Sequence, residues 1–280
     1  MIRYGCHSEN FGILTPEETF HLIHQLGFDC IDVAARSLIP QSNILESPSI
    51  CALQLSELSK RHTLPLSELF LSDVEVDGQS VSPVTAGAGN IELIRHFDQN
   101  FDRICQFAKK AGFLSIMGSA GCEQKSIGFS RSFEYAAATL HRQVSIASSY
   151  GLAFHVEPSR QSLLHTVDAA QNMANEVPGL RYTLDFLHYH IQNIPLSESM
   201  QLLPLAGHLH ARQAKVDIGK CDFSQGEIDY SRITSQMKKI HWQGDITMEF
   251  WCSDELSAQG IQAVEQNILM RYTLKKLLGN

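Results

Sequence analysis

Four short segments in the second half of the chain each look like a buried strand that ends on a residue able to bind a metal ion. The segments are AFHVEP, RYTLDF, GHLHAR and ITMEFW, and their candidate ligands are Glu157, Asp185, His210 and Glu249. Three carboxylates and one imidazole would form one site for a hard divalent cation if these strands lie side by side. Each interval between them has room for a helix, as a parallel strand-helix-strand unit requires.

The rest of the chain continues this alternation. Further strands are expected at residues 2–7, 30–36, 64–73 and 114–121, and helices at 15–27, 50–61, 91–112, 130–150, 163–176, 196–203, 230–240 and 258–278. Eight strand and helix pairs without a linker predict an α/β fold, a single (β/α)8 TIM barrel over residues 1–280. An open doubly wound sheet is less favoured, because no GxGxxG follows the first strand and no P-loop is present.

In a barrel, side chains at positions i and i+2 of a strand share a face. His208 and His210 therefore both point inward, and His210 is nearer the carboxyl end of its strand, where barrel active sites lie. This selects His210 as the ligand. We expect His155 and His208, one layer deeper, to be hydrogen-bonded groups of the barrel interior.

Composition excludes several classes of protein. The net charge of −8 opposes a nucleic-acid surface, which needs a basic stripe. No stretch approaches the roughly 18 apolar residues of a membrane span, and no signal peptide is recognisable. The seven cysteines are scattered without a CxxC pair, as expected for reduced thiols. We therefore expect a cytoplasmic protein without nucleic-acid or membrane partners; the oligomeric state, homo-oligomer included, stays open.

The pattern of a strand-end Glu, an Asp-x-x-His, a His-x-His and a final Glu resembles the xylose-isomerase-like TIM barrels. That family includes sugar isomerases, ketose 3-epimerases, inosose dehydratases and endonuclease IV. The resemblance implies that the four candidate residues named above are metal ligands. It also implies that His188 contacts substrate or metal and that Arg212 contacts substrate; Arg160 is a further candidate for substrate binding.

Two departures from relatives narrow this comparison. Ketose 3-epimerases carry a further glutamate shortly after the first ligand, but residues 158–163 contain none. Endonuclease IV uses a three-metal cluster, for which the first half of this chain offers only His7, Asp73 and Glu123. We therefore expect one ion per chain, Mn²⁺ or Mg²⁺ from the oxygen-rich ligand set, with Co²⁺ or Zn²⁺ as alternatives.

The ligand set predicts a metal-dependent isomerase or epimerase acting on a small sugar, ketose or polyol. The ion would polarise the carbonyl and stabilise an enediolate, while Glu157 and Glu249 remove and return the proton. His188 and Arg212 would orient hydroxyl oxygens. A lyase of the keto-inositol dehydratase type is the alternative on the same site, and a phosphodiesterase of the endonuclease IV type is disfavoured by the acidic charge.

Two connections are longer than a barrel needs, at residues 74–90 and 213–226. Both follow strands, so they are expected on the face that carries the active site. For the first loop, a lid that closes over bound substrate and a plain surface excursion both fit its Gly and Ser content.

Overall fold

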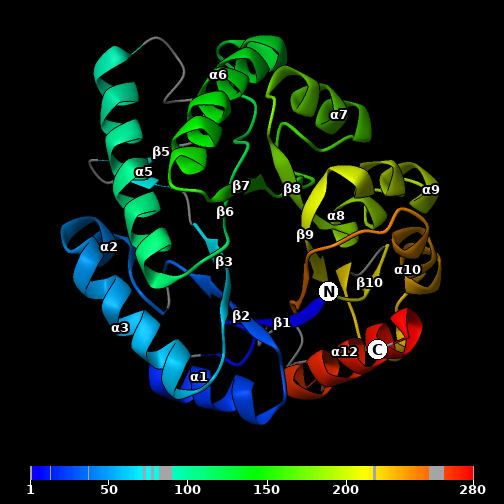
Figure 1. The fold of residues 1–280 in the computed structure, drawn as a ribbon. Coiled ribbons are helices and arrows are strands. Elements are labelled where there is room, and N and C mark those ends of the chain that lie inside the picture. Colours follow the sequence, from blue (N-terminus) through cyan, green and yellow to red (C-terminus); the bar gives the residue numbers. More distant parts are fainter. Residues whose placement is uncertain are drawn as a thin grey trace.

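The computed structural model describes residues 2–12, 14–36, 38–71, 74–76, 79–81, 90–216, 219–251 and 262–279. Eight parallel strands close into a barrel in the order β1-β12-β9-β8-β7-β6-β3-β2 (Figure 1). The barrel strands are β1 (Arg3–His7), β2 (Cys30–Ala34), β3 (Leu66–Phe70), β6 (Ser115–Gly118), β7 (Ala153–Val156), β8 (Arg181–Asp185), β9 (Ala206–Ala211) and β12 (Asp245–Met248). The predicted TIM barrel is confirmed.

Helices surround the barrel on its outside (Figure 1). They are α1 (Pro16–Gln25), α2 (Gln41–Glu46), α3 (Pro48–Arg61), α5 (Ile91–Ala111), α6 (Gly128–Ser149), α7 (Val167–Glu176), α8 (Phe186–His190), α9 (Leu196–Ser199), α10 (Tyr230–Lys239) and α12 (Ala263–Leu278). The apolar core lies between these helices and the outward faces of the strands, and includes Ile31, Leu69 and Ile116 at 0% exposure.

Local sequence explains where several helices begin and end. Thr15 and Glu18 form a reciprocal capping box at the start of α1. The helix α5 ends at Gly112, whose φ of 104° suits a residue without a Cβ. The helix predicted from residue 163 begins only at Val167, because Thr166 caps it by accepting from the Ala169 N–H.

One predicted helix takes a different form, and short helices were missed. The helix expected at 196–203 is split into α9 and the 3₁₀ helix η1 (Met200–Leu205), which contains Pro204 and so lacks one N–H donor. The short helix α8 follows β8 directly and was not predicted, because its five residues are too few for a helical period.

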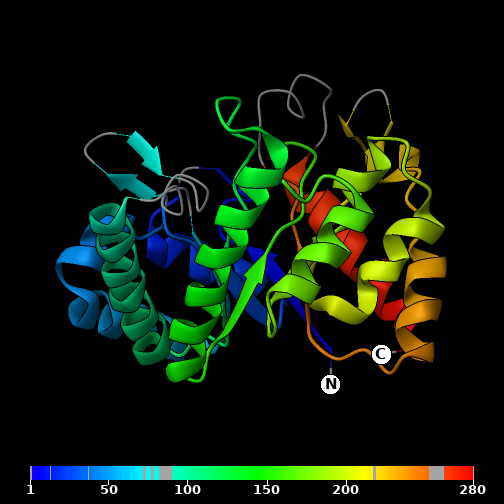
Figure 2. The same cartoon turned by 90° about the horizontal axis from the view of Figure 1, so that it is seen from above.

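Both long connections include small hairpins. The first loop, for which a lid and a surface excursion were both open, contains β4 (Val74–Val76) and β5 (Gln79–Val81), which pair antiparallel, whereas its residues 77, 78 and 82–89 lie outside the described residues. The second loop contains the antiparallel pair β10 (Ala214–Lys215) and β11 (Gly219–Lys220), then η2 (Phe223–Gln225). Figure 2 shows both hairpins on the side of the barrel opposite to the two chain termini, so they flank the carboxyl ends of the strands.

The barrel interior is unusually polar for a fold whose interior is commonly filled by branched apolar side chains. Glu68 of β3 accepts hydrogen bonds from Ser115 and Thr183 and pairs with His155 Nδ1 at 2.5 Å. His155 is thus hydrogen-bonded inside the barrel, as expected. Its ring lies against Gly207, where an added Cβ would come within 2.3 Å of Nε2. At the amino-terminal end, Ser67 and Arg3 both donate to Asp245.

No helix in the described part of the chain is long and apolar enough to span a membrane. The six cysteines that the structure describes are all free thiols. Asp73 and Cys252 lie outside the described residues, as do residues 258–261 of the predicted last helix.

Candidate metal centre

The four predicted ligands lie at the carboxyl ends of four adjacent barrel strands. Asp185 ends β8 and His210 lies near the end of β9, while Glu157 and Glu249 directly follow β7 and β12. Asp185 and Thr247 both align with His210 in the strand register. Asp185, His210 and Glu249 are at most 1% exposed, and Glu157 is partly buried.

His210 joins two of the carboxylates. Its Nδ1 lies 3.1 Å from Glu157 Oε1 and 3.3 Å from Glu249 Oε2. Atoms of these three residues lie within 4.8 Å of one another, close enough to coordinate one ion. The structure therefore brings together three of the four residues predicted from the sequence as ligands.

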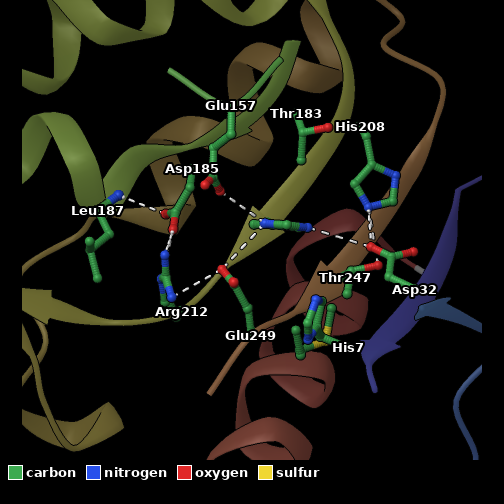
Figure 3. Close-up of polar contacts among 12 residues, drawn as sticks. His7, Asp32, Glu157, Thr183, Asp185, Leu187, His208, Arg212, Thr247 and Glu249 are labelled. Atoms are coloured by element: carbon green, nitrogen blue, oxygen red, sulfur yellow. Dashed lines mark hydrogen bonds and ion pairs between the residues drawn. The ribbon is translucent and has the colours of Figure 1, made fainter. Parts of the chain in front are cut away.

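Asp185 belongs to a second, overlapping group. Donor atoms of Asp185, Glu157 and His188 also lie within 4.8 Å of one another. Its Oδ1 accepts from the Leu187 N–H at 2.8 Å, which caps α8. Its Oδ2 accepts from Arg212 Nε at 2.6 Å (Figure 3). In this state the carboxylate of Asp185 pairs with a guanidinium, whereas Glu157 and Glu249 face the imidazole of His210.

Arg212 is 4% exposed and lies between two carboxylates (Figure 3). Besides Asp185, it contacts Glu249, with its Nη1 3.0 Å from Glu249 Oε2. Tyr230 fixes the backbone of Arg212, because its hydroxyl donates to the Arg212 carbonyl at 2.9 Å. The residue predicted to touch substrate thus also orients two predicted ligands.

The close packing of charged side chains at this site shifts their pKa values. Burial would raise the pKa of Glu249, but Arg212 and His210 lower it to about 2. Burial opposes ionisation of Glu157 as well, yet His188 and His210 hold its pKa well below the ordinary value. Burial would lower the pKa of His210, whereas Glu249, Asp32 and Glu157 raise it well above the ordinary value. The surroundings therefore favour the charged forms of Glu157, Glu249 and His210.

The donor set fits a divalent cation. Three buried or half-buried carboxylates face one guanidinium and the imidazole of His210, and the buried negative charge that remains needs neutralisation. Glu249 Oε2 makes ion-pair contacts with Arg212 and His210, and both ring nitrogens of His188 are buried without a hydrogen-bond partner among the described residues. His188 Nε2 lies 3.6 Å from Glu157 Oε2, so its ring stands beside the predicted ligands. An oxygen-rich site with one or two imidazoles suits Mn²⁺ or Mg²⁺.

Arg160 differs from the other predicted residues. Its side chain is exposed in the segment after β7, and among the described residues no hydrogen bond or ion pair joins it to the site. A role for Arg160 in substrate binding therefore stays a prediction from the family resemblance.

Two residues of the first two strands border the site. Asp32 was not identified from the sequence, and His7 was considered only as a ligand of a three-metal cluster. Asp32 of β2 is 1% exposed, and its Oδ2 lies 3.5 Å from His210 Nε2. His7 of β1 is fully buried with its ring centroid 6.1 Å from that of His210. His7 Nδ1 accepts from the Glu9 N–H, and Nε2 has no partner in the described part of the chain. A charged residue inside an apolar strand such as CIDVA was the sequence feature that could have identified Asp32.

Solved structures with this fold include several sugar epimerases. A D-psicose 3-epimerase from Clostridium cellulolyticum H10, solved with D-tagatose, has a TM-score of 0.79 and 14% identity, and the match covers 99% of each chain. A 3-keto-D-glucoside 4-epimerase from E. coli has a TM-score of 0.73 and 16% identity, covering 97% of this chain and 100% of that one.

A probable 3-DHS dehydratase from Bacillus anthracis is also similar, with a TM-score of 0.71, 14% identity and 99% coverage of each chain. No curated protein sequence matches the chain significantly. Similarity to solved structures at such low sequence identity shows a shared fold.

The family model described as xylose isomerase-like TIM barrel matches residues 20–271, a range that contains all four predicted ligands. The chain belongs to this family of barrels.

Proposed function

We propose that the protein is a divalent-metal-dependent isomerase or epimerase that acts on a small sugar, ketose or polyol by proton transfer. The arrangement of Glu157, His210 and Glu249 carries this proposal, because their donor atoms lie close enough together for one ion. Asp185 would complete the set by turning from Arg212 toward the ion. Sugar epimerases among the structures of similar fold support the same reaction class.

The bound ion would polarise the carbonyl of the substrate and stabilise the negative charge that develops when the neighbouring carbon loses its proton. Glu157 and Glu249 lie 3.1 and 3.3 Å from His210 Nδ1, and the neighbouring cations hold the pKa of each carboxyl below its ordinary value, which favours the ionised form. Either can therefore accept the proton, and return of the proton to another carbon or another face gives the isomer or the epimer.

His188 and Arg212 would bind substrate oxygens. The free ring nitrogens of His188 lie beside Glu157, where they can meet a hydroxyl group of a bound sugar. Arg212 keeps Asp185 and Glu249 in place and has further N–H groups for a substrate oxygen. Neither residue needs to exchange a proton with carbon to act in this way.

A lyase of the keto-inositol dehydratase type is the second candidate. The absence of a glutamate in residues 158–163 favours it, since this is where the sequence departs from ketose 3-epimerases. The likeness to a probable dehydratase structure is consistent with it. Such an enzyme would use the same proton abstraction and then expel a β-hydroxyl group.

Proton NMR in D₂O separates these possibilities. Protein loaded with Mg²⁺, which does not broaden the spectra, would be incubated with ketoses, aldoses and inososes. Exchange of a carbon-bound proton for deuterium with formation of another sugar supports the isomerase or epimerase, and formation of an enone with loss of water supports the lyase. Metal-loaded, folded protein that exchanges no proton in any compound would refute both; the double variant E157Q/E249Q is the control.

A further inference from the structure

We propose that Asp32 is a positioning residue of the metal centre, which holds His210 with its Nε2 proton toward β2 and its Nδ1 free to bind the ion. The inference rests on the proposed metal site and extends it to a strand in the first half of the barrel. It assigns a role to a buried carboxylate that the proton-transfer steps above do not use.

The geometry of the His210 ring carries the inference. Nδ1 faces Glu157 and Glu249 at 3.1 and 3.3 Å, whereas Nε2 faces Asp32 Oδ2 at 3.5 Å. A neutral imidazole that binds a metal through one nitrogen carries its proton on the other. A carboxylate on the Nε2 side favours the tautomer with the proton there, and so leaves the lone pair of Nδ1 for the ion. The ring is 1% exposed, so water is a poor substitute for Asp32.

Asp32 is itself held in one orientation. Its Oδ1 accepts from the Glu68 N–H at 3.1 Å, and its Oδ2 pairs with His208 Nε2 at 2.8 Å. His208 Nε2 also lies 3.2 Å from Thr247 Oγ1, on the neighbouring strand β12. Figure 3 shows Asp32 beside His208 and Thr247. These contacts hold the carboxylate in the orientation in which its Oδ2 faces His210. Asp32 therefore has the rigid support that an orienting group requires.

The same residues could be taken for a second cation site. Donor atoms of Asp32, Glu68, His208 and His210 lie within 4.8 Å of one another. However, both Glu68 oxygens are already bonded, Oε1 to Ser115 and His155 and Oε2 to Thr183. A carboxylate that already contacts three side chains has little capacity left for a metal ion, whereas a hydrogen-bonded network is well suited to orient the ligand above it.

Mn²⁺ binding to D32N tests the inference, with E68Q as the matched control. Both variants neutralise one fully buried carboxylate of the barrel interior, but only Asp32 contacts a predicted ligand. Titration followed by electron paramagnetic resonance should show about 10- to 100-fold weaker binding for D32N, the usual cost of losing such an orienting partner. E68Q should bind nearly as wild type does. The visible spectrum of bound Co²⁺ should change in D32N and stay unchanged in E68Q.

Wild-type affinity with an unchanged Co²⁺ spectrum in D32N would overturn the role of Asp32 and leave the metal site intact. Equal losses in D32N and E68Q would also overturn it, since they would reflect general damage to the polar interior. If wild-type protein binds no Mn²⁺, the proposed metal site fails, and the role of Asp32 with it.

A second measurement needs no variant at position 32, in case D32N does not fold. ¹⁵N NMR of histidine-labelled, Zn²⁺-loaded wild type should show His210 protonated at Nε2, with its resonance assigned by H210A. A proton on Nδ1 in the metal-loaded protein would overturn the inference.

Discussion

Arg212 donates from Nε to Asp185 Oδ2 at 2.6 Å, and both side chains are nearly inaccessible to solvent. The same guanidinium lies 3.0 Å from Glu249. In the described structure Asp185 is thus balanced by a protein cation, and it must share or leave that contact to bind a metal ion. Arg212 therefore orients predicted ligands in addition to its expected contact with substrate.

Arg212→Ala should retain bound metal while lowering kcat/KM on the true substrate. Removing the guanidinium leaves more negative charge around the ion, so binding of the cation is not lost, but a charged donor to substrate and ligand oxygens is gone. The expected loss is about 1–3 kcal/mol of transition-state stabilisation. Arg212→Lys keeps the positive charge but loses the planar guanidinium, so its kcat/KM should lie between those of the wild type and Arg212→Ala. Wild-type kinetics in Arg212→Ala would show that the residue has no part in the reaction.

Single substitutions of the predicted ligands should each weaken metal binding. We expect about one ion per chain in wild type, and lower occupancy in E157Q, D185N, H210A and E249Q, because each removes one of four donors. Elemental analysis after gel filtration measures this. His188→Ala is the control and should keep its metal; if it does not, His188 is a ligand, as its closeness to Glu157 and Asp185 permits. Full occupancy in two or more ligand variants would refute the site.

The apparent affinity for metal should increase with pH across the neutral range. His210 must lose its Nδ1 proton to bind an ion, and Glu249, Asp32 and Glu157 raise its pKa well above the ordinary value despite burial. Below that pKa the proton competes with the ion, so affinity should rise by about tenfold per pH unit and level off once His210 is neutral. Glu249, with a pKa of about 2, stays ionised throughout. Calorimetric titrations giving one constant Kd between about pH 6 and 8 would contradict this linkage.

Gly207→Ala should destabilise the barrel by about 1–3 kcal/mol, because the added Cβ meets the ring of His155 in a packed interior. Urea denaturation of the metal-free protein gives the change in the free energy of unfolding. In a His155→Asn background the cost should be smaller, since Asn removes Nε2 and Cε1 while keeping a donor near Glu68. Equal costs in the two backgrounds would show that His155 is not the obstacle.

The barrel could be predicted from the sequence because strand and helix patterns repeat regularly along the chain. Short apolar strands and capped helices alternate along the chain, and the strand-end residues follow from the two-residue repeat of a strand. His155 and His208 illustrate this: the repeat placed them one layer below the ligands, and both are hydrogen-bonded there.

The partners of these residues were not predictable in the same way. Asp32 meets His208 across 176 residues of sequence, and the pairing of Arg212 with Asp185 depends on which rotamer each adopts across two adjacent strands. Periodicity indicates which face a residue occupies, but not which of several inward-facing carboxylates it contacts. For the same reason the sequence did not show that His7, at the end of the first strand, lies beside His210.

Anomalous diffraction from a crystal grown with Mn²⁺ tests the central claim most directly. We predict one strong peak in each chain, coordinated by Glu157, Asp185, His210 Nδ1 and Glu249, with the contact between Arg212 and Asp185 Oδ2 either shared with the ion or broken. A peak among Asp32, Glu68 and His208, or no peak in the barrel at an Mn²⁺ concentration that saturates binding in solution, would contradict the account.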